Sequence, residues 1–211
     1  ENITVFMKFN SDLFNFFDLA NSLEFKEFYD AFWELTHIPL ALVDVKDPNN
    51  NILLCPKEKF NPICKLFCSS PKARKKCIAF DDIMAKEAAV THRGICYKCH
   101  AGLMDFSVPI YVRKTHIATI NCGQILPEAP TEDGFNKLWN AVCDLGVNEK
   151  ELQKAYFESF YMSEEKVKSV LRLLTFFSDY FCEVGVRLRL LDRKDKYPDI
   201  AKAVEYLKKN Y

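Results

Sequence analysis

The sequence lacks an excess of charge of either sign. Lys and Arg together number 29, as do Asp and Glu, so the formal net charge at pH 7 is zero. A protein that holds nucleic acid through its own surface needs a positive field that replaces phosphate counterions. We therefore do not expect this chain to bind DNA directly.

Long apolar segments are also missing. A membrane-spanning helix needs about 18 uninterrupted apolar residues, and no such stretch occurs. The N-terminal residues do not combine a basic segment with an apolar core, as a secretory signal peptide does. We expect a cytoplasmic protein that does not enter a membrane.

The common signatures of catalysis are absent as well. The sequence contains no nucleophile-elbow glycine pattern, no phosphate-binding loop and no HExxH zinc motif. Cys99 and His100 form the one adjacent thiol–imidazole pair, but neighbouring residues of a strand point to opposite faces. We expect the chain not to be an enzyme.

Core-forming side chains, in contrast, are abundant. Of the 211 residues, 49% are hydrophobic and 14% are aromatic, with 18 Phe among them. Disordered segments avoid such side chains, and a chain of this length can bury one sizeable core. We expect one folded body with helical extensions.

Apolar spacing in the first half predicts a helix followed by a hairpin and a second helix. The first helix is expected over residues 10–37, with Ser22 as a cap and an apolar stripe facing a sheet. Residues 40–45 and 52–54 read as two strands joined by a turn. A helix beginning at Pro71 and ending near Gly94 follows in a cysteine-rich segment.

The second half predicts another hairpin and then helices alone. Residues 106–112 and 117–126 are expected to pair, and the sheet should end near residue 127. The order of elements predicts an α+β fold of PAS- or GAF-like type: an antiparallel sheet with flanking helices, a cysteine-rich helical insert and a long C-terminal signalling helix.

The long C-terminal helix is expected over residues 163–194. Its apolar residues recur with a mean spacing of 3.5, which is typical of a coiled-coil seam: Val167, Val170, Leu174, Phe177, Phe181, Val184, Leu188 and Leu191. Two uses of this seam remain open. The helix either forms a parallel homodimer through 163–194 or packs on its own sheet.

Residues 60–126 resemble the PocR ligand-sensing family. The resemblance is carried by Ile63-Cys64, Cys77, the block Cys-His-Ala-Gly-Leu-Met-Asp-Phe at 99–106, Val108-Pro109-Ile110 and Gly123-Gln124-Ile125-Leu126. Several blocks in one order are far more specific than one short motif. The resemblance implies a PAS-like domain that senses small hydrocarbon derivatives, such as diols, and controls an attached output module.

Residues 197–211 resemble the opening helix of an AraC-type helix-turn-helix domain. The chain is then expected to divide into a sensor domain at 1–162, a signalling or dimerisation helix at 163–196 and the beginning of a DNA-binding domain at 197–211. DNA would be bound only through the part that is missing here. The expected function is ligand sensing in a bacterial AraC-family transcription regulator.

The nine cysteines suggest reduced thiols or a metal site, because a chain with so large a core needs no disulfide framework. Cys64, Cys77, Cys96 and Cys99 would suit Zn²⁺ or an iron–sulfur cluster. These cysteines could equally be small buried hydrophobes, or thiols that contact a ligand or respond to redox conditions. A metal- or redox-responsive sensor is therefore the alternative function.

A ligand is expected between the sheet and the cysteine-rich insert. The candidate ligand-binding residues are Cys64, Cys77, Cys99, His100, Asp105 and Gln124. A small diol needs a few convergent polar groups in an apolar wall. The alternatives are that Asp105 and Gln124 pair with each other or with other protein groups, that His100 is a satisfied structural histidine, and that the chain is only a dimerisation module.

Overall fold

The computed structural model describes residues 14–46, 51–53 and 57–196, with the single helical positions Lys202, Tyr206 and Lys209 beyond them. For residues 51–53 and 186–196 it describes the chain path but not the side chains. The predicted turn at 47–51 lies almost wholly outside these ranges. The AraC-like segment at 197–211 lies outside them except for the three single positions.

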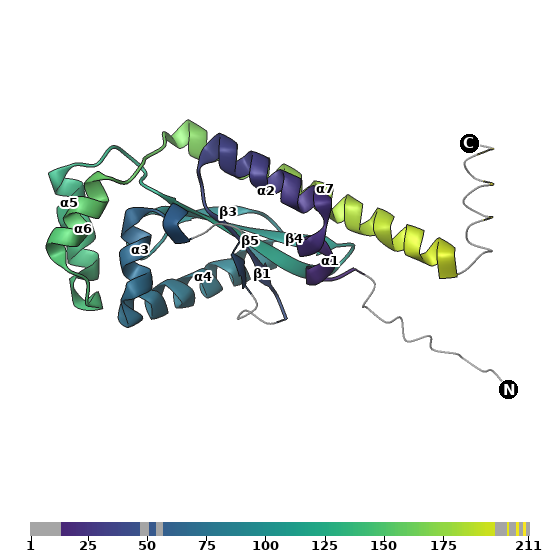
Figure 1. The fold of residues 1–211 in the computed structure, drawn as a ribbon, viewed down its shortest axis with the longest axis horizontal. Coiled ribbons are helices and arrows are strands. Elements are labelled where there is room, and N and C mark those ends of the chain that lie inside the picture. The colour runs from purple at the N-terminus through teal and green to yellow at the C-terminus, as the bar shows by residue number, and fades with distance from the viewer. Residues whose placement is uncertain are drawn as a thin grey trace.

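The fold is α+β, as predicted: a five-stranded antiparallel sheet with helices on both faces (Figure 1). The strand order is β2-β1-β5-β4-β3. The strands are β1 (Leu40–Asp44), β2 (Asn51–Leu53), β3 (Ile95–Lys98), β4 (Met104–Val112) and β5 (Thr115–Ile125). The α-helices are α1 (Phe16–Asn21), α2 (Leu23–Thr36), α3 (Pro62–Ser69), α4 (Pro71–Thr91), α5 (Glu132–Val142), α6 (Glu149–Phe157) and α7 (Glu164–Lys196).

Both predicted hairpins are confirmed. β1 pairs with β2, and β4 pairs with β5 in a ladder whose register shifts between Met104 and Asp105. The edge strand β3 was not predicted. It has only four residues, of which Tyr97 alone is buried, so it shows no alternation that the sequence could reveal.

The helix predicted over residues 10–37 is in fact two helices over its described part. Ser22 has an extended backbone, with ψ at 146°, and so ends α1. Its Oγ accepts a hydrogen bond from the N–H of Phe25 at 3.2 Å, which caps α2. The prediction that Ser22 caps a helix was correct, but the residues before it form a separate short helix rather than the same one.

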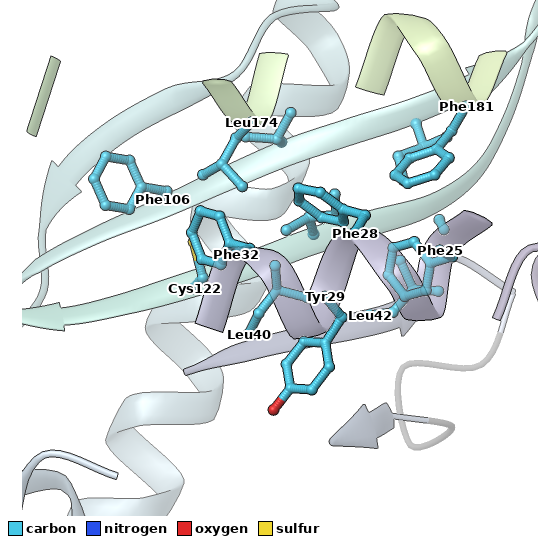
Figure 2. Close-up of a cluster of buried hydrophobic side chains, with 14 of the residues drawn as sticks. Phe25, Phe28, Tyr29, Phe32, Leu40, Leu42, Phe106, Cys122, Leu174 and Phe181 are labelled. Atoms are coloured by element: carbon cyan, nitrogen blue, oxygen red, sulfur yellow. The ribbon is translucent and has the colours of Figure 1, made fainter. Parts of the chain in front are cut away.

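The main core lies between the sheet and the pair α2 and α7. Phe25, Phe28 and Phe32 of α2 point toward Leu174 and Phe181 of α7 and toward the sheet (Figure 2). The rings of Phe25 and Phe181 lie 5.2 Å apart. Aromatic pairs of this kind add to the free energy gained by burying their area.

The apolar seam of α7 packs against the chain's own sheet. Val167, Val170, Leu174 and Phe181 are buried in the main core, and Val184 is buried as well. The hydroxyl of Ser178 also donates a hydrogen bond to the carbonyl of Pro109 in β4, at 2.7 Å. Of the two uses that the 3.5-residue spacing left open, the structure shows packing on the sheet for this part of the helix.

A second, smaller core forms at one end of the sheet. Ile63 and Phe67 of α3 pack there with Leu138 of α5 and with Leu152 and Tyr156 of α6. Helices α3 and α6 are in direct contact. This core holds α3 and α4 over the face of the sheet that α2 and α7 leave uncovered (Figure 1).

Candidate functional site

A cavity of about 270 Å³ lies between the sheet and the insert formed by α3 and α4. This volume is close to the lower limit, about 300 Å³, of common ligand pockets. Its apolar wall includes Leu40 of β1, Phe60, Phe67 of α3 and Leu103. A shallower groove of about 500 Å³ on α4 shares Cys68, Arg74 and Ile78 with the cavity but contains no residue of the sheet. We therefore regard the smaller, sheet-backed cavity as the site.

The six predicted ligand-binding residues converge on this cavity. Cys64 comes from α3, Cys77 from α4, Cys99 and His100 from the turn after β3, Asp105 from β4 and Gln124 from β5. These residues are spread over 61 positions of sequence, so only the fold brings them together. All six line the cavity, some from the sheet and some from the insert.

Asp105 is the central acid of the cavity. Its Oδ1 accepts a hydrogen bond from the backbone N–H of Gln124 at 2.6 Å. The pKa of the Asp105 carboxyl is raised to about 7. Burial is the main cause, and the nearby carboxylate of Asp81 makes a smaller contribution. At neutral pH this carboxyl is therefore close to half protonated, so it can act as hydrogen-bond donor or acceptor.

Asp81 and Tyr97 are cavity residues that sequence reasoning missed. Burial raises the pKa of Asp81 to about 6, and the hydroxyl of Tyr97 donates to its Oδ1 at 3.4 Å. Both could have been found by spacing. Asp81 follows Cys77 by one helical turn, and Tyr97 precedes Cys99 by two positions of extended chain, so each shares a face with a predicted residue.

His100 is held as a neutral imidazole. Its Nε2 lies 3.1 Å from Sγ of Cys77, and its ring stacks on Phe67 with centroids 5.6 Å apart. The pKa of His100 is lowered to about 4. Burial is the main cause, and the positive charge of Lys76 makes a smaller contribution. The buried Nδ1 has no hydrogen-bond partner among the described residues. The atom is shielded from solvent, so a ligand hydroxyl could reach it only if the ring moved.

Three of the four cysteines predicted to bind a metal line the cavity, and the fourth does not. Cys96 packs against the main core on the opposite side of the sheet, because successive residues of β3 alternate between faces. Within the described ranges, no group of three or more His, Cys, Asp or Glu residues is placed to hold a metal ion. The four-thiolate arrangement expected from the Cys96–Cys99 spacing is thus not formed there.

The cavity thiols are protonated at neutral pH. Burial raises the pKa of Cys77 to about 12, and burial likewise raises the pKa values of Cys64 and Cys99 above the ordinary thiol range. A protonated thiol is a weak hydrogen-bond donor and a poor nucleophile. The three cysteines therefore contribute a soft and largely apolar part of the wall.

Gly123 and Gln124 bend β5 beside the cavity. Gly123 has a φ of 144°, and Gln124 a φ of 66°. The side-chain Oε1 of Gln124 accepts a hydrogen bond from the backbone N–H of Asn61 at 2.9 Å. Of the alternatives for Gln124, the structure thus shows pairing with another protein group. Asp105 pairs with Gly123 and Met104 with Ile125, so Gln124 is the extra residue of a β-bulge.

Comparison with protein families matches residues 18–186 to the sensory domain found in PocR. The chain belongs to the PocR sensory domain family. The resemblance noted over residues 60–126 is thus confirmed and extended to most of the fold. The match ends before residues 197–211, so the AraC-type resemblance stays a prediction.

One relative of this PocR domain is the Regulatory protein PocR of Salmonella typhimurium strain LT2. It is 33% identical over 66 residues, which make up 31% of this chain and 22% of the relative. The chain therefore matches about a fifth of that protein. No solved structure matches the chain. Within the described residues, no helix is long and apolar enough to cross a membrane.

Proposed function

We propose that this PocR domain senses a small organic molecule that carries hydroxyl groups, such as a diol, and that the molecule binds in the cavity between the sheet and α3–α4. The observation that carries the proposal is the convergence of Cys64, Cys77, Cys99, His100 and Asp105 on one enclosed space. The relative's printed description as a regulatory protein supports a role in regulation.

The chemistry of the wall suits a neutral ligand with donor and acceptor groups. The carboxyls of Asp81 and Asp105 can accept hydrogen bonds from hydroxyls of the ligand. The rings of Phe60, Phe67 and Phe80 would pack against carbon atoms of the ligand. Few polar groups in an apolar wall are what orient a small molecule in a pocket.

In the full regulator, we propose that α7 transmits ligand binding to an AraC-type DNA-binding part beyond this chain. The domain itself then acts in the cytoplasm as a PAS-like receiver and catalyses no reaction. A ligand that prefers one arrangement of α7 over another shifts the population of the two. The order of cavity, long helix and AraC-like segment supports this arrangement.

Filling the cavity should abolish this response. Cys77→Phe places an aromatic ring in a space of about 270 Å³, so we expect the affinity for a short diol to fall at least about tenfold, or 1.4 kcal/mol. Thermal shift with propane-1,2-diol and related diols, followed by calorimetry, measures this. Ile83→Phe is the control, because Ile83 is exposed on α4 and does not line the cavity. Unchanged binding in Cys77→Phe would refute the site.

Stabilisation of the wild type by Zn²⁺ alone would favour the metal-responsive alternative.

A homodimer through α7 also belongs to the proposal. Since the seam of α7 is buried in part, a partner would need the other side of the helix, where Phe176 is 67% exposed and Tyr180 41% exposed. Sedimentation at high protein concentration should show a dimer, and Phe176→Glu should shift it to monomer. Glu149→Lys, a charge reversal at an exposed residue of α6 and outside α7, should leave the dimer intact. A monomer at every concentration would contradict this part of the proposal.

A further inference from the structure

The polar wall of the cavity continues as a chain of hydrogen bonds toward the beginning of α7. Oδ1 of Asp105 is bound by the N–H of Gln124, at 2.6 Å. Gln124 in turn is bound twice by Asn61, whose N–H donates to Oε1 at 2.9 Å and whose Nδ2 donates to the backbone carbonyl at 3.0 Å. These bonds connect the cavity acid to the first residue of the insert.

Asn61 is a junction of three segments. It is 2% exposed, and its Oδ1 accepts hydrogen bonds from the N–H of Ile63 and from the hydroxyl of Ser159, each at 2.9 Å. Its side chain thus caps α3, holds β5 and reaches the segment after α6. A buried amide that leaves such partners loses about 1–3 kcal/mol for each group left unpaired. A movement of α3, of β5 or of the segment after α6 therefore strains the hydrogen bonds that Asn61 makes to the other two.

Ser159 supplies a choice between two bonds. Its hydroxyl carries one proton, but two acceptors lie within reach: Oδ1 of Asn61 at 2.9 Å and the carbonyl of Ala155 at 2.7 Å. Donation to Ala155 is the ordinary bond of a serine to the residue four positions earlier in a helix. Ser159 is only 5% exposed, so water cannot readily serve as a third partner. The hydroxyl has two discrete arrangements.

The segment that follows Ser159 is tied to β5 and leads directly into α7. The N–H of Leu126 donates to the carbonyl of Phe160 at 3.1 Å, and the N–H of Met162 donates to the carbonyl of Leu126 at 3.2 Å. Oγ of Ser163 then accepts a bond from the N–H of Lys166, in the first turn of α7. The segment between Ser159 and α7 is thus short and held by backbone hydrogen bonds, so a displacement of Ser159 is passed on to the start of the helix.

We propose that Asn61 and Ser159 are coupling residues, which carry a change at Asp105 to the first turns of α7. The inference rests on the proposed function for the nature of the signal, but the coupling itself exists without a ligand. A group that binds Asp105 competes with the N–H of Gln124. Gln124 and Asn61 then shift together, and the Ser159 hydroxyl turns to Ala155. The segment from Phe160 to Ser163 loses its tie to the insert, and the start of α7 loosens.

A ligand-free double-mutant cycle tests this coupling. Asp105→Asn replaces the carboxylate that accepts the N–H of Gln124 by a neutral and weaker acceptor, and Ser159→Ala removes the hydroxyl that joins Asn61 to the segment before α7. Amide hydrogen exchange at residues 164–172 is measured at about pH 8, relative to exchange in β1, which contains no residue of the chain of bonds, as a reference for global stability. We expect Asp105→Asn to change exchange at 164–172 by about fivefold in the wild-type background and by less than about twofold in Ser159→Ala.

Ser169→Ala is the matched control, since Ser169 makes the same kind of bond to the carbonyl four residues earlier but is exposed on α7 and remote from the chain of bonds. Asp105→Asn should act in that background as in the wild type. Asn61→Asp is a second variant: it keeps the cap of α3 and the backbone bond to Oε1 of Gln124 but loses the Nδ2 donor to the Gln124 carbonyl, so it should weaken the coupling less than Ser159→Ala does.

An equal effect of Asp105→Asn with and without the Ser159 hydroxyl would overturn the coupling, as would no effect at 164–172 in the wild type. Neither result depends on whether a diol binds. Conversely, failure of every diol to bind would refute the proposed ligand and leave the cycle unaffected. The two proposals can therefore fail separately.

Discussion

Gly123→Ala should lower the free energy of unfolding by about 3 kcal/mol or more. A Cβ at this position would lie 2.5 Å from Cα of Asp105 and 2.6 Å from the carbonyl oxygen of Met104. Both are backbone atoms of the paired strand β4, so no side-chain rotation can relieve the collision. The φ of 144° adds strain for any L-residue. Urea unfolding measures the effect.

Gly102→Ala is the control for this change. Gly102 also has a positive φ, of 81°, but a Cβ there would have nothing within 4 Å. Its replacement should therefore cost only the backbone strain, about 1 kcal/mol. If the two variants were equally stable, the close approach of β4 and β5 at the edge of the cavity would not constrain residue 123.

Asp105→Asn should make the domain more stable at about pH 8 and leave it nearly unchanged at about pH 4. The folded chain raises the pKa of Asp105 from 3.8 to about 7, so folding favours the protonated acid. This contribution to stability is complete below about pH 4 and is lost as the pH rises to about 7. The full difference is on the order of 4 kcal/mol. Asparagine is neutral throughout and can still accept the bond from Gln124.

The measurement is the free energy of unfolding of both proteins between pH 4 and pH 8. His100 acts with the opposite sign, because its pKa is lowered to about 4 in the folded chain and its contribution is lost as the pH falls from about 6.5. The difference between wild type and variant removes the His100 effect. Asp82→Asn, the same change at an exposed residue of α4, is the matched control. If the difference in free energy of unfolding between wild type and Asp105→Asn did not change with pH, the raised pKa of Asp105 would be refuted.

Regular spacing explains which elements could be predicted from the sequence. The apolar repeat of α7 and the long, largely buried runs of β4 and β5 extend over many residues, so their type and approximate limits follow directly. The strand β3 and the break at Ser22 depend on tertiary packing and on one backbone angle. Short elements of this kind give no periodic signal.

The candidate site was predictable only where residues stand in a recognisable block. Cys99, His100 and Asp105 fall within one block of the family pattern, and the structure places all three in the cavity. Asn61 and Ser159 are 98 positions apart and share no motif, so nothing in the sequence indicates that they meet. Hydrogen bonds between distant segments follow from the packing of whole elements, which spacing does not report.

The geometry of α7 converts small rotations into large displacements. The helix has 33 residues and is therefore about 50 Å long. Near Gly185 the helix lies against Val112, the last residue of β4, and its remaining turns extend past the sheet (Figure 1). A rigid helix that pivots at its first turns moves most at its far end. A tilt of a few degrees at its first turns would move its far end by several ångströms, about the rise of one helical turn.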